Sequence, residues 1–172
     1  MELYKQQQEA LEAMVRFVES DESVFILKGY AGTGKTTLIK TFCREAIAKG
    51  KTMLLMAPTG RAAKMLGKKT DFGASTIHQA IYRHDVSYLK CHDDEGNPIL
   101  VGGLSVAAGK DDGSDDVDLY FDIKKLEDKV DAKSCVIVVD EASMISSRMV
   151  RGEMLHFGTD VLLDDLLTFA HL

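Results

Sequence analysis

The chain has 172 residues, of which 45% are hydrophobic and 28% are charged, the composition of one soluble globular domain with a buried core. This length leaves no room for a second full domain of similar size, and no apolar run approaches the roughly 18 residues that a membrane span needs. Because the acidic N-terminus also lacks the layout of a signal peptide, we expect a cytoplasmic protein without a membrane partner.

The charge of the chain is unevenly distributed. The net charge is −6, yet residues 51–90 carry seven Lys and Arg against two Asp and Glu, whereas residues 91–131 carry four against twelve. The basic segment could face the phosphates of a nucleic acid, but charge alone favours an ordinary solvated surface.

Cysteine usage indicates neither a disulfide framework nor a metal site. Cys43, Cys91 and Cys135 lie far apart without a CxxC pair, so we expect reduced thiols. The run "CHDDE" at residues 91–95 contains metal-ligating side-chain types, but no second half of such a site accompanies it, and we expect no metal there.

The first part of the chain is expected to form a helix, a strand and a second helix in turn. Residues 6–19 carry apolar side chains at helical spacing, and residues 24–27 form a short apolar run typical of a parallel strand buried on both faces. Residues 36–49 then have the pattern of a helix, closed by Gly50 just beyond its end.

Strands and helices continue to alternate in the rest of the chain. We expect buried strands at residues 52–58 and 134–142, short helices at 61–66 and 77–83, and a last helix within 160–172. The alternation predicts an α/β fold, a three-layer domain with a mostly parallel sheet and right-handed crossovers. Residues 91–118, rich in Gly and Asp, predict a hairpin-like surface insertion spanning about 85–131.

A glycine-rich stretch follows the first predicted strand. Gly29–Thr36 fits the pattern G-x-x-x-x-G-K-[ST], whose backbone N–H groups and helix N-terminus cradle phosphates. In this pattern the Lys35 ammonium reaches the β and γ oxygens of a nucleotide, and the Thr36 hydroxyl binds Mg²⁺. The alternative is a glycine-rich turn without a ligand. The candidate nucleotide-binding residues of this stretch are Gly29, Gly32, Thr33, Gly34, Lys35, Thr36 and Thr37.

An acidic pair ends the third predicted strand. In nucleotide hydrolases with this loop, an aspartate such as Asp140 holds Mg²⁺, and a glutamate such as Glu141 orients and deprotonates the attacking water. Acidic residues at strand ends are common, so the prediction depends on the presence of Lys35 and Thr36. Together, Lys35, Asp140 and Glu141 are the candidate catalytic residues, and Thr36 and Asp140 the candidate metal ligands.

Four motifs in this order resemble superfamily 1 DNA helicases. "GYAGTGKTT" is similar to motif I, "APTGRAAK" at residues 57–64 to motif Ia, "STIH" at 75–78 to the TIH element, and "VVDEASMIS" at 138–146 to motif II. The RecD-like and TraA-like branch, which moves 5′ to 3′, is the most similar. The resemblance implies that residues 1–172 form a single RecA-like domain, the first motor domain of a helicase that hydrolyses ATP with Mg²⁺.

The resemblance also implies roles for residues that spacing cannot identify. Gln7 is similar to the glutamine that recognises adenine, although a glutamine in "KQQQEA" is by itself more often a solvated helix residue. Contacts with the backbone of single-stranded DNA are implied for residues inside the basic segment, which therefore gains a functional interpretation. These residues are Pro58, Thr59, Gly60, Arg61, Thr76 and His78.

The family resemblance predicts that part of the motor is missing. Such helicases carry a second RecA-like domain in cis that supplies an arginine finger, and the sequence ends before motif III. Because unpaired strand edges are costly, we expect a truncated product that pairs these edges directly, swaps with a neighbour or stays marginally stable. On its own it should hydrolyse ATP weakly and unwind no DNA. The alternative function is a non-catalytic module that binds single-stranded DNA or a protein in a nucleotide-dependent manner. A small-molecule kinase is disfavoured because the insertion is acidic rather than rich in Arg.

Overall fold

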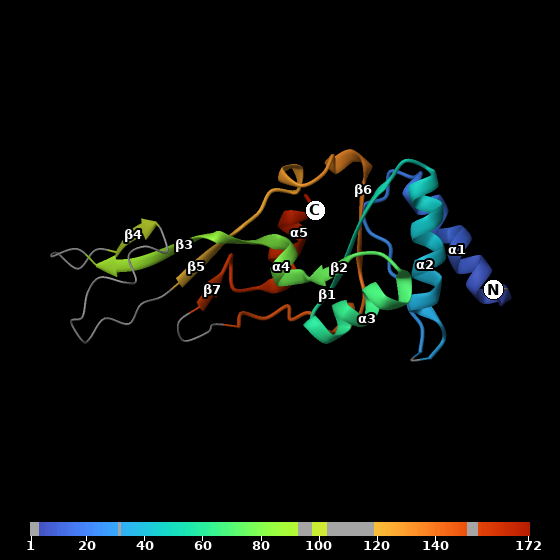
Figure 1. Ribbon diagram of the computed structural model, residues 1–172, viewed down its shortest axis with the longest axis horizontal. Helices are drawn as coiled ribbons and strands as arrows, with labels where there is room; N and C mark the ends of the chain where they lie inside the picture. The colour runs from blue at the N-terminus through green and yellow to red at the C-terminus, as the bar shows by residue number, and fades with distance from the viewer. Residues whose placement is uncertain (1–3, 31, 93–97, 103–118, 151–154) are drawn as a thin grey trace. The chain divides into compact units, whose positions relative to one another are not determined.

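A computed structural model describes residues 4–30, 32–92, 98–102, 119–150 and 155–172, and only the backbone over 84–92 and 98–102 (Figure 1). The chain divides into two compact units. Unit 1 comprises Met1–Ile77 and Lys129–Ser143, and unit 2 comprises His78–Asp128 and Met144–Leu172. The single domain over residues 1–172 stays a prediction.

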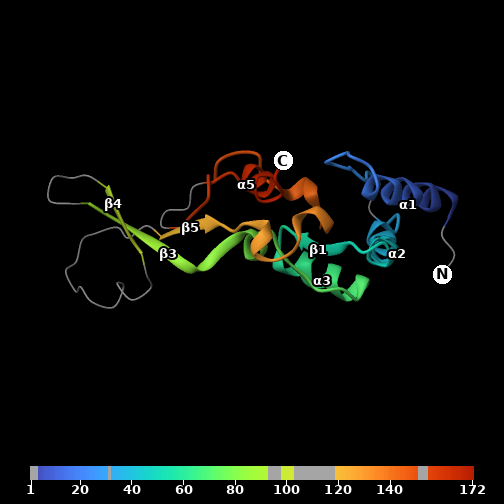
Figure 2. The same cartoon turned by 90° about the horizontal axis from the view of Figure 1, so that it is seen from above.

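Unit 1 is an α/β unit, as the sequence predicts. Its strands β1 (Thr52–Ala57), β2 (Ala74–Thr76) and β6 (Cys135–Val139) form a parallel sheet in the order β2-β1-β6. Its helices are α1 (Lys5–Val18), α2 (Lys35–Ala48) and α3 (Gly60–Thr70), and a 3₁₀ turn at Ala132–Ser134 leads into β6. Figure 2 shows α2 lying between α1 and α3.

Helix α2 is buried on two sides, so its apolar residues face two different neighbours. One side packs with Leu11 and Met14 of α1 through Leu38 and Phe42. The other side presents a second apolar cluster to the sheet and to α3. This cluster consists of Ile39, Cys43, Leu55 and Leu66.

The end of α2 matches the prediction that Gly50 closes it. Gly50 has φ of +79°, a left-handed conformation that glycine adopts without strain. The N–H of Lys51 donates to the carbonyl of Ala46, and the N–H of Gly50 donates to that of Ile47. These two hydrogen bonds form a Schellman motif, which satisfies carbonyls that the helix itself leaves unpaired.

The predicted strand at residues 24–27 is wrong. These residues belong to no strand, and the Val24 and Ile26 side chains are 56% and 72% exposed. A strand is stabilised by ladder hydrogen bonds to a neighbour, and β6, the edge of the sheet order, makes none to this segment. Leu27 packs against the cluster between α1 and α2, and the Phe25 ring contacts that of Phe17 at 5.6 Å. An apolar run is therefore partly buried by helix packing without joining the sheet.

Unit 2 is built on a mixed sheet. Strands β3 (Tyr82–His92), β4 (Pro98–Gly102), β5 (Leu119–Ile123) and β7 (Leu155–Phe157) have the order β4-β3-β5-β7. β3 is antiparallel to β4 and β5, which confirms the hairpin-like insertion, whereas β5 and β7 are parallel. The unit also contains the 3₁₀ turn Leu126–Asp128 and α5 (Leu162–Phe169). Helix α4 spans Ile77–Ile81; its first residue, Ile77, belongs to unit 1 and the rest of the helix to unit 2. A further 3₁₀ turn, Ala142–Met144, follows β6.

Two helix boundaries differ from the predictions. The helix expected over residues 77–83 ends at Ile81, because Tyr82 pairs with Ile123 in the sheet and opens β3. Helix α3 continues four residues beyond the predicted end at residue 66, to Thr70. Asp71 then ends it in a left-handed conformation with φ of +63°. The first boundary is thus set by a sheet partner far along the chain, whereas the second is set locally, where the N–H of Asp71 donates to the Gly67 carbonyl.

Within the described ranges, no helix combines the length and apolar character needed to cross a membrane. Those same ranges contain no cluster of three or more His, Cys, Asp or Glu side chains suited to a metal ion. The side chains of residues 91–95 lie outside the described part of the chain.

Candidate functional site

The carboxyl ends of the three parallel strands of unit 1 share one edge of the sheet. Ala57 at the end of β1 pairs with Thr76 at the end of β2, and Met56 pairs with Val139 at the end of β6. The N–H of Asp140 donates to the Met56 carbonyl at 3.0 Å. In open α/β sheets ligands bind at this edge, so the predicted site residues that follow the strands lie where binding is expected.

The glycine-rich loop has the backbone that its sequence pattern requires. Gly32 and Gly34 have φ of +80° and +81°, values that L side chains rarely adopt. Gly34 is the N-cap of α2, and no side chain caps the helix there. The first N–H groups of α2 therefore remain available to an anion, which the helix dipole also attracts.

Lys35 folds back onto the loop. Its Nζ donates to the carbonyl oxygens of Gly29 at 2.7 Å and Tyr30 at 2.9 Å. The Thr33 hydroxyl donates to the Tyr30 carbonyl as well, at 2.9 Å. The ammonium thus lies at the mouth of the loop, where a phosphate oxygen would be a stronger acceptor than a neutral carbonyl.

Thr36 and Asp140, separated by 104 positions in the sequence, lie side by side. The Thr36 Oγ1 is 3.5 Å from the Asp140 Oδ2. The other carboxylate oxygen of Asp140 accepts a hydrogen bond from the N–H of Glu141 at 3.0 Å. A hydroxyl and a carboxylate are hard oxygen ligands of the kind that Mg²⁺ prefers, so these residues fit the ion that the sequence implies.

Glu141 has an unusual backbone. Its φ is +55°, and its side chain is exposed. Residues other than glycine rarely adopt this conformation, and where they do the cost is on the order of 1–3 kcal/mol. Such strain tends to occur at functional sites, where the backbone aims a side chain.

Gln7 joins α1 to the glycine-rich loop. Its Nε2 donates to the Thr33 carbonyl at 3.1 Å, and its Oε1 accepts from the N–H of Tyr4 at 3.1 Å. A Cβ placed on Gly34 would lie 2.7 Å from the Gln7 Nε2. The amide therefore abuts the loop directly, unlike that of a solvated helix residue.

The predicted DNA-contacting residues fall into two groups. Pro58, Thr59, Gly60 and Arg61 follow β1, and Thr76 ends β2, so these five lie at the same sheet edge. The Thr59 hydroxyl oxygen caps α3 by accepting from the N–H of Ala62 at 3.2 Å, and Arg61 is exposed. His78 is the first residue of unit 2.

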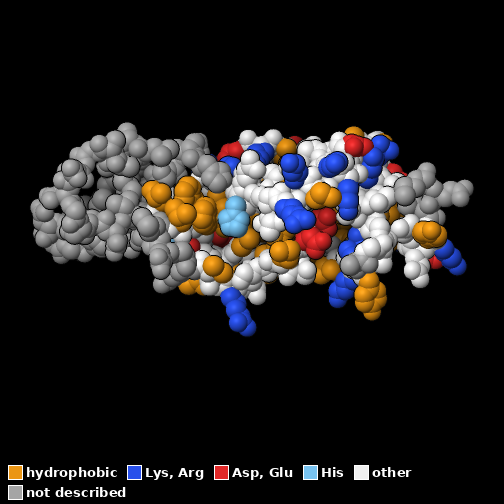
Figure 3. Space-filling view, turned by 60° about the horizontal axis from the view of Figure 1, so that its bottom comes forward, with side chains coloured by type: hydrophobic (Ala, Val, Ile, Leu, Met, Phe, Trp, Pro, Cys, Tyr) orange, Lys and Arg blue, Asp and Glu red, His pale blue; other side chains and the backbone are white. Residues whose placement is uncertain are grey.

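Basic side chains accompany the first group. Helix α3 also carries exposed Lys64, Lys68 and Lys69, and Lys and Arg side chains are numerous on the face of unit 1 seen in Figure 3. One of the acidic side chains of unit 1, Asp71, is paired with Lys40, whose hydrogen bond and charge lower the pKa of the Asp71 carboxyl.

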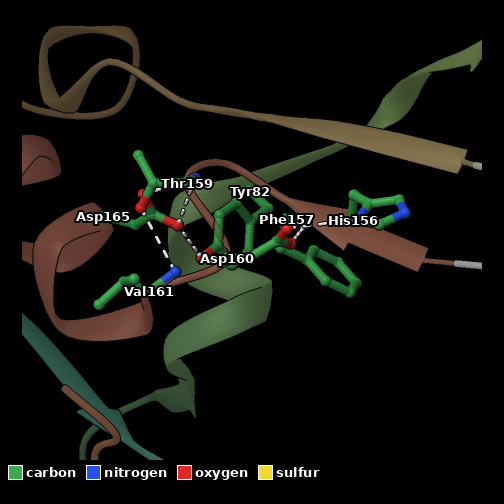
Figure 4. Close-up of polar contacts among 7 residues, drawn as sticks. All are labelled: Tyr82, His156, Phe157, Thr159, Asp160, Val161 and Asp165. Atoms are coloured by element: carbon green, nitrogen blue, oxygen red, sulfur yellow. Dashed lines mark hydrogen bonds and ion pairs between the residues drawn. The ribbon is translucent and has the colours of Figure 1, made fainter. Parts of the chain in front are cut away.

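A buried polar cluster in unit 2 was not predicted from the sequence (Figure 4). The fully buried Asp165 carboxylate accepts hydrogen bonds from the Tyr82 hydroxyl at 2.5 Å, from the Thr159 N–H at 3.0 Å and from the Thr159 hydroxyl at 2.8 Å. Burial and the bond to Asp165 raise the pKa of Tyr82. No local signal marks this cluster, because Tyr82 and Asp165 are 83 positions apart.

Comparisons with known proteins bear on the site in unit 1. A model of the AAA domain family matches residues 2–156. The chain is 35% identical over 88 residues to the ATP-dependent DNA helicase dda of Enterobacteria phage T4, covering 51% of this chain and 20% of that protein. It is 43% identical over 56 residues to the ATP-dependent RecD2 DNA helicase of Deinococcus radiodurans, covering 33% of this chain and 8% of that protein.

A third relative matches a longer stretch. An uncharacterized protein of Methanocaldococcus jannaschii is 32% identical over 139 residues, covering 78% of this chain and 10% of that protein. The chain thus spans about a fifth or less of the length of the curated relatives it matches.

Proposed function

The chain belongs to the AAA domain family, and from that premise we propose that it is the ATP-binding and ATP-hydrolysing motor domain of a superfamily 1 DNA helicase. The observation that carries this proposal is the juxtaposition of Thr36 and Asp140 beside the glycine-rich N-terminus of α2. Two of its relatives are named ATP-dependent DNA helicases, which supports the same assignment. The polarity proposed is 5′ to 3′, by resemblance to the RecD-like branch.

The residues of the loop bind the triphosphate of ATP. Backbone N–H groups at the start of α2 and around Gly32 and Gly34 donate to phosphate oxygens. Lys35 exchanges its two carbonyl partners for phosphate oxygens, because charge-assisted hydrogen bonds are about twice as strong as bonds to neutral acceptors. Thr33 and Thr37 flank these contacts, and Gln7, which touches the loop through the Thr33 carbonyl, recognises the adenine.

The catalytic chemistry belongs to Glu141 and to the ligands of the metal. Thr36 and Asp140 hold Mg²⁺, which when bound neutralises the negative charge on the phosphate oxygens. Glu141 orients and deprotonates the water that attacks the γ-phosphate. Its exposed side chain and left-handed backbone are consistent with a carboxylate directed away from the sheet edge toward a ligand.

Single-stranded DNA is the proposed nucleic-acid partner. The contacts are assigned to Pro58, Thr59, Gly60, Arg61, Thr76 and His78. The exposed basic residues of α3 add sequence-independent attraction to the phosphate backbone, so the affinity should fall with rising salt concentration. A second RecA-like domain, in cis in a full helicase, would supply the arginine finger, an effect of about 10³–10⁵ in rate.

The test compares nucleotide binding, turnover and DNA binding in the same set of variants. We expect the parent chain to bind a fluorescent ATP analogue, and Lys35→Ala to abolish that binding. We expect Glu141→Gln to retain binding but to lose the residual magnesium-dependent hydrolysis. Lys49→Ala, on the far end of α2 from the loop, is the control and should behave as the parent.

The outcome separates the two functions considered. Turnover above background that Glu141→Gln removes supports the motor domain. DNA binding that depends on nucleotide, with turnover already at background in the parent, would instead support the non-catalytic binding module. Failure of the parent to bind the ATP analogue would refute both.

A further inference from the structure

The imidazole of His78 packs against two aromatic rings of unit 2. Its ring centroid lies 5.5 Å from that of Tyr82 and 5.3 Å from that of Phe157, the latter in an edge-to-face arrangement. Tyr82 is four residues further along the chain and opens β3 directly after α4. The two rings also contact each other, at 5.0 Å. The two rings therefore form one continuous aromatic surface against which His78 packs.

Phe157 is itself held in place by the turn that follows β7. Its N–H donates to the Asp160 carboxylate at 3.1 Å, and its carbonyl accepts from the N–H of Asp160 at 2.7 Å. Its ring stacks on that of Phe121 at 4.7 Å, with an angle of 13° between the planes. The backbone and the ring of Phe157 are thus fixed independently of His78.

Tyr82 is held by the buried carboxylate. Its side chain is 1% exposed, and its hydroxyl donates to Asp165, which is 0% exposed, at 2.5 Å. Asp165 cannot move freely to follow Tyr82, because Thr159 donates two further hydrogen bonds to it. Figure 4 shows Tyr82 lying between Asp165 and Phe157. The hydrogen bonds of the polar cluster therefore hold in place the Tyr82 ring, one of the two rings that contact His78.

We propose that Tyr82 and Phe157 are positioning residues for DNA binding, which orient the His78 ring for its contact with single-stranded DNA, and that Asp165 keeps Tyr82 in place. This inference rests on the proposed function of His78. A side chain that is already ordered loses less conformational entropy on binding than one that is ordered by the ligand. The aromatic cluster thereby contributes to DNA affinity without touching DNA.

A double-mutant cycle tests whether Tyr82 acts through His78. The probe is a fluorescein-labelled oligothymidylate, and its affinity is measured by fluorescence anisotropy. We expect Tyr82→Leu to weaken binding about threefold to tenfold, the value of one aromatic contact expressed as affinity. In the His78→Ala background the same substitution should change the affinity by less than about twofold, since the group it positions is absent.

Two further variants keep the test decisive. Tyr82→Phe retains the ring but removes its hydrogen bond to Asp165, so its affinity should lie between those of the parent and Tyr82→Leu, because the ring still packs on His78 without the restraint from the carboxylate. Phe157→Leu removes the second ring at a half-buried position, and it carries the cycle if Tyr82→Leu does not fold. The NMR signals of the His78 imidazole, recorded without DNA, should move most in Tyr82→Leu and Phe157→Leu and less in Tyr82→Phe.

Each result has a defined meaning. Equal losses of affinity in the parent background and in the His78→Ala background would show that the rings act on folding rather than on His78, and would overturn the inference while leaving the proposed function intact. Unchanged affinity in Tyr82→Leu and Phe157→Leu would do the same. A parent chain that does not bind the oligothymidylate would refute the DNA-binding function, and the inference with it.

Discussion

Gly158 makes the tightest approach to the buried carboxylate of unit 2, and its replacement gives the clearest prediction of stability. Its φ is +50°, and a Cβ at this position would lie 2.4 Å, 2.8 Å and 2.6 Å from the Oδ2, Oδ1 and Cγ of Asp165. Such distances are impossible for real atoms, so Gly158→Ala must displace the carboxylate. The displacement cannot be a free rotation, because Tyr82 and Thr159 hold both oxygens.

The magnitude follows from two contributions. The left-handed backbone costs a non-glycine residue about 1–2 kcal/mol. Moving the carboxylate breaks or weakens hydrogen bonds to a charged group, each worth about 1.5–3 kcal/mol, and leaves a buried polar group poorly satisfied. We expect Gly158→Ala to lower the free energy of unfolding of unit 2 by about 4 kcal/mol, out of a typical total of about 5–15 kcal/mol.

Two other glycines separate these contributions. Gly50 has φ of +79° but open space around its Cβ position, so Gly50→Ala should cost only the backbone term of about 1 kcal/mol. Gly73 has neither a positive φ nor a close neighbour, and Gly73→Ala should change stability by less than about 0.5 kcal/mol.

The assay is urea denaturation, followed by far-UV circular dichroism for the whole chain and by the near-UV tyrosine signal for the aromatic cluster. We expect the near-UV transition of Gly158→Ala to move to a much lower urea concentration. If Gly158→Ala is no more destabilising than Gly50→Ala, the carboxylate relocates without cost and the reasoning is refuted.

Three further predictions concern the glycine-rich loop, the Tyr82 hydroxyl and the Cys43 thiol. Gly34→Ala should weaken binding of the ATP analogue at least tenfold, because Gly34 has φ of +81° and a Cβ there would lie 2.7 Å from the Gln7 Nε2. Adding Gln7→Ala removes the close contact but not the backbone strain, so it should restore little of the affinity. Full restoration would contradict this reasoning. Because the pKa of Tyr82 is raised in the folded state, above about pH 10 the tyrosine loses its proton in the unfolded chain before it does so in the folded one. The free energy of unfolding, measured by urea denaturation, should therefore fall by about 1.4 kcal/mol per pH unit in that range. An equal fall in Tyr82→Phe would show that Tyr82 is not its cause. Burial raises the pKa of the Cys43 thiol to about 11 and shields it from solvent, so iodoacetamide should not alkylate it in the folded chain. Peptide mass spectrometry should detect alkylated Cys43 only after urea unfolds the chain. Rapid alkylation of the native protein would refute this prediction.

Local features of the fold were predictable because local interactions specify them. The end of α2 at Gly50 depends on hydrogen bonds within six residues, and the start of α2 at Lys35 on the glycine just before it. The strands β1 and β6 also lie where their apolar runs predict them. The segment at residues 24–27 has an equally apolar sequence but no strand, because a strand also requires a partner on the sheet, which composition cannot supply.

In the candidate site too, some features are specified locally and others depend on contacts between distant parts of the chain. The spacing of Gly29–Thr36 identifies the loop, because the motif is contiguous and its chemistry depends on the backbone of a few residues. Thr36 lies beside Asp140 because of the order of the strands in the sheet. Gln7 touches the loop because α1 packs against α2. The resemblance to a known family anticipated the role of Gln7, although periodicity and composition did not.

By itself, then, the sequence determined the α/β class, the phosphate-binding loop and the acidic pair, since each is encoded within a short segment. The tertiary structure alone decided which apolar run joins the sheet, where the helix after Thr76 ends, and which aromatic rings the His78 side chain packs against. The physical reason is distance along the chain. Asp165 and Tyr82 acquire their roles from a single hydrogen bond across 83 positions, and only folding brings its two ends together.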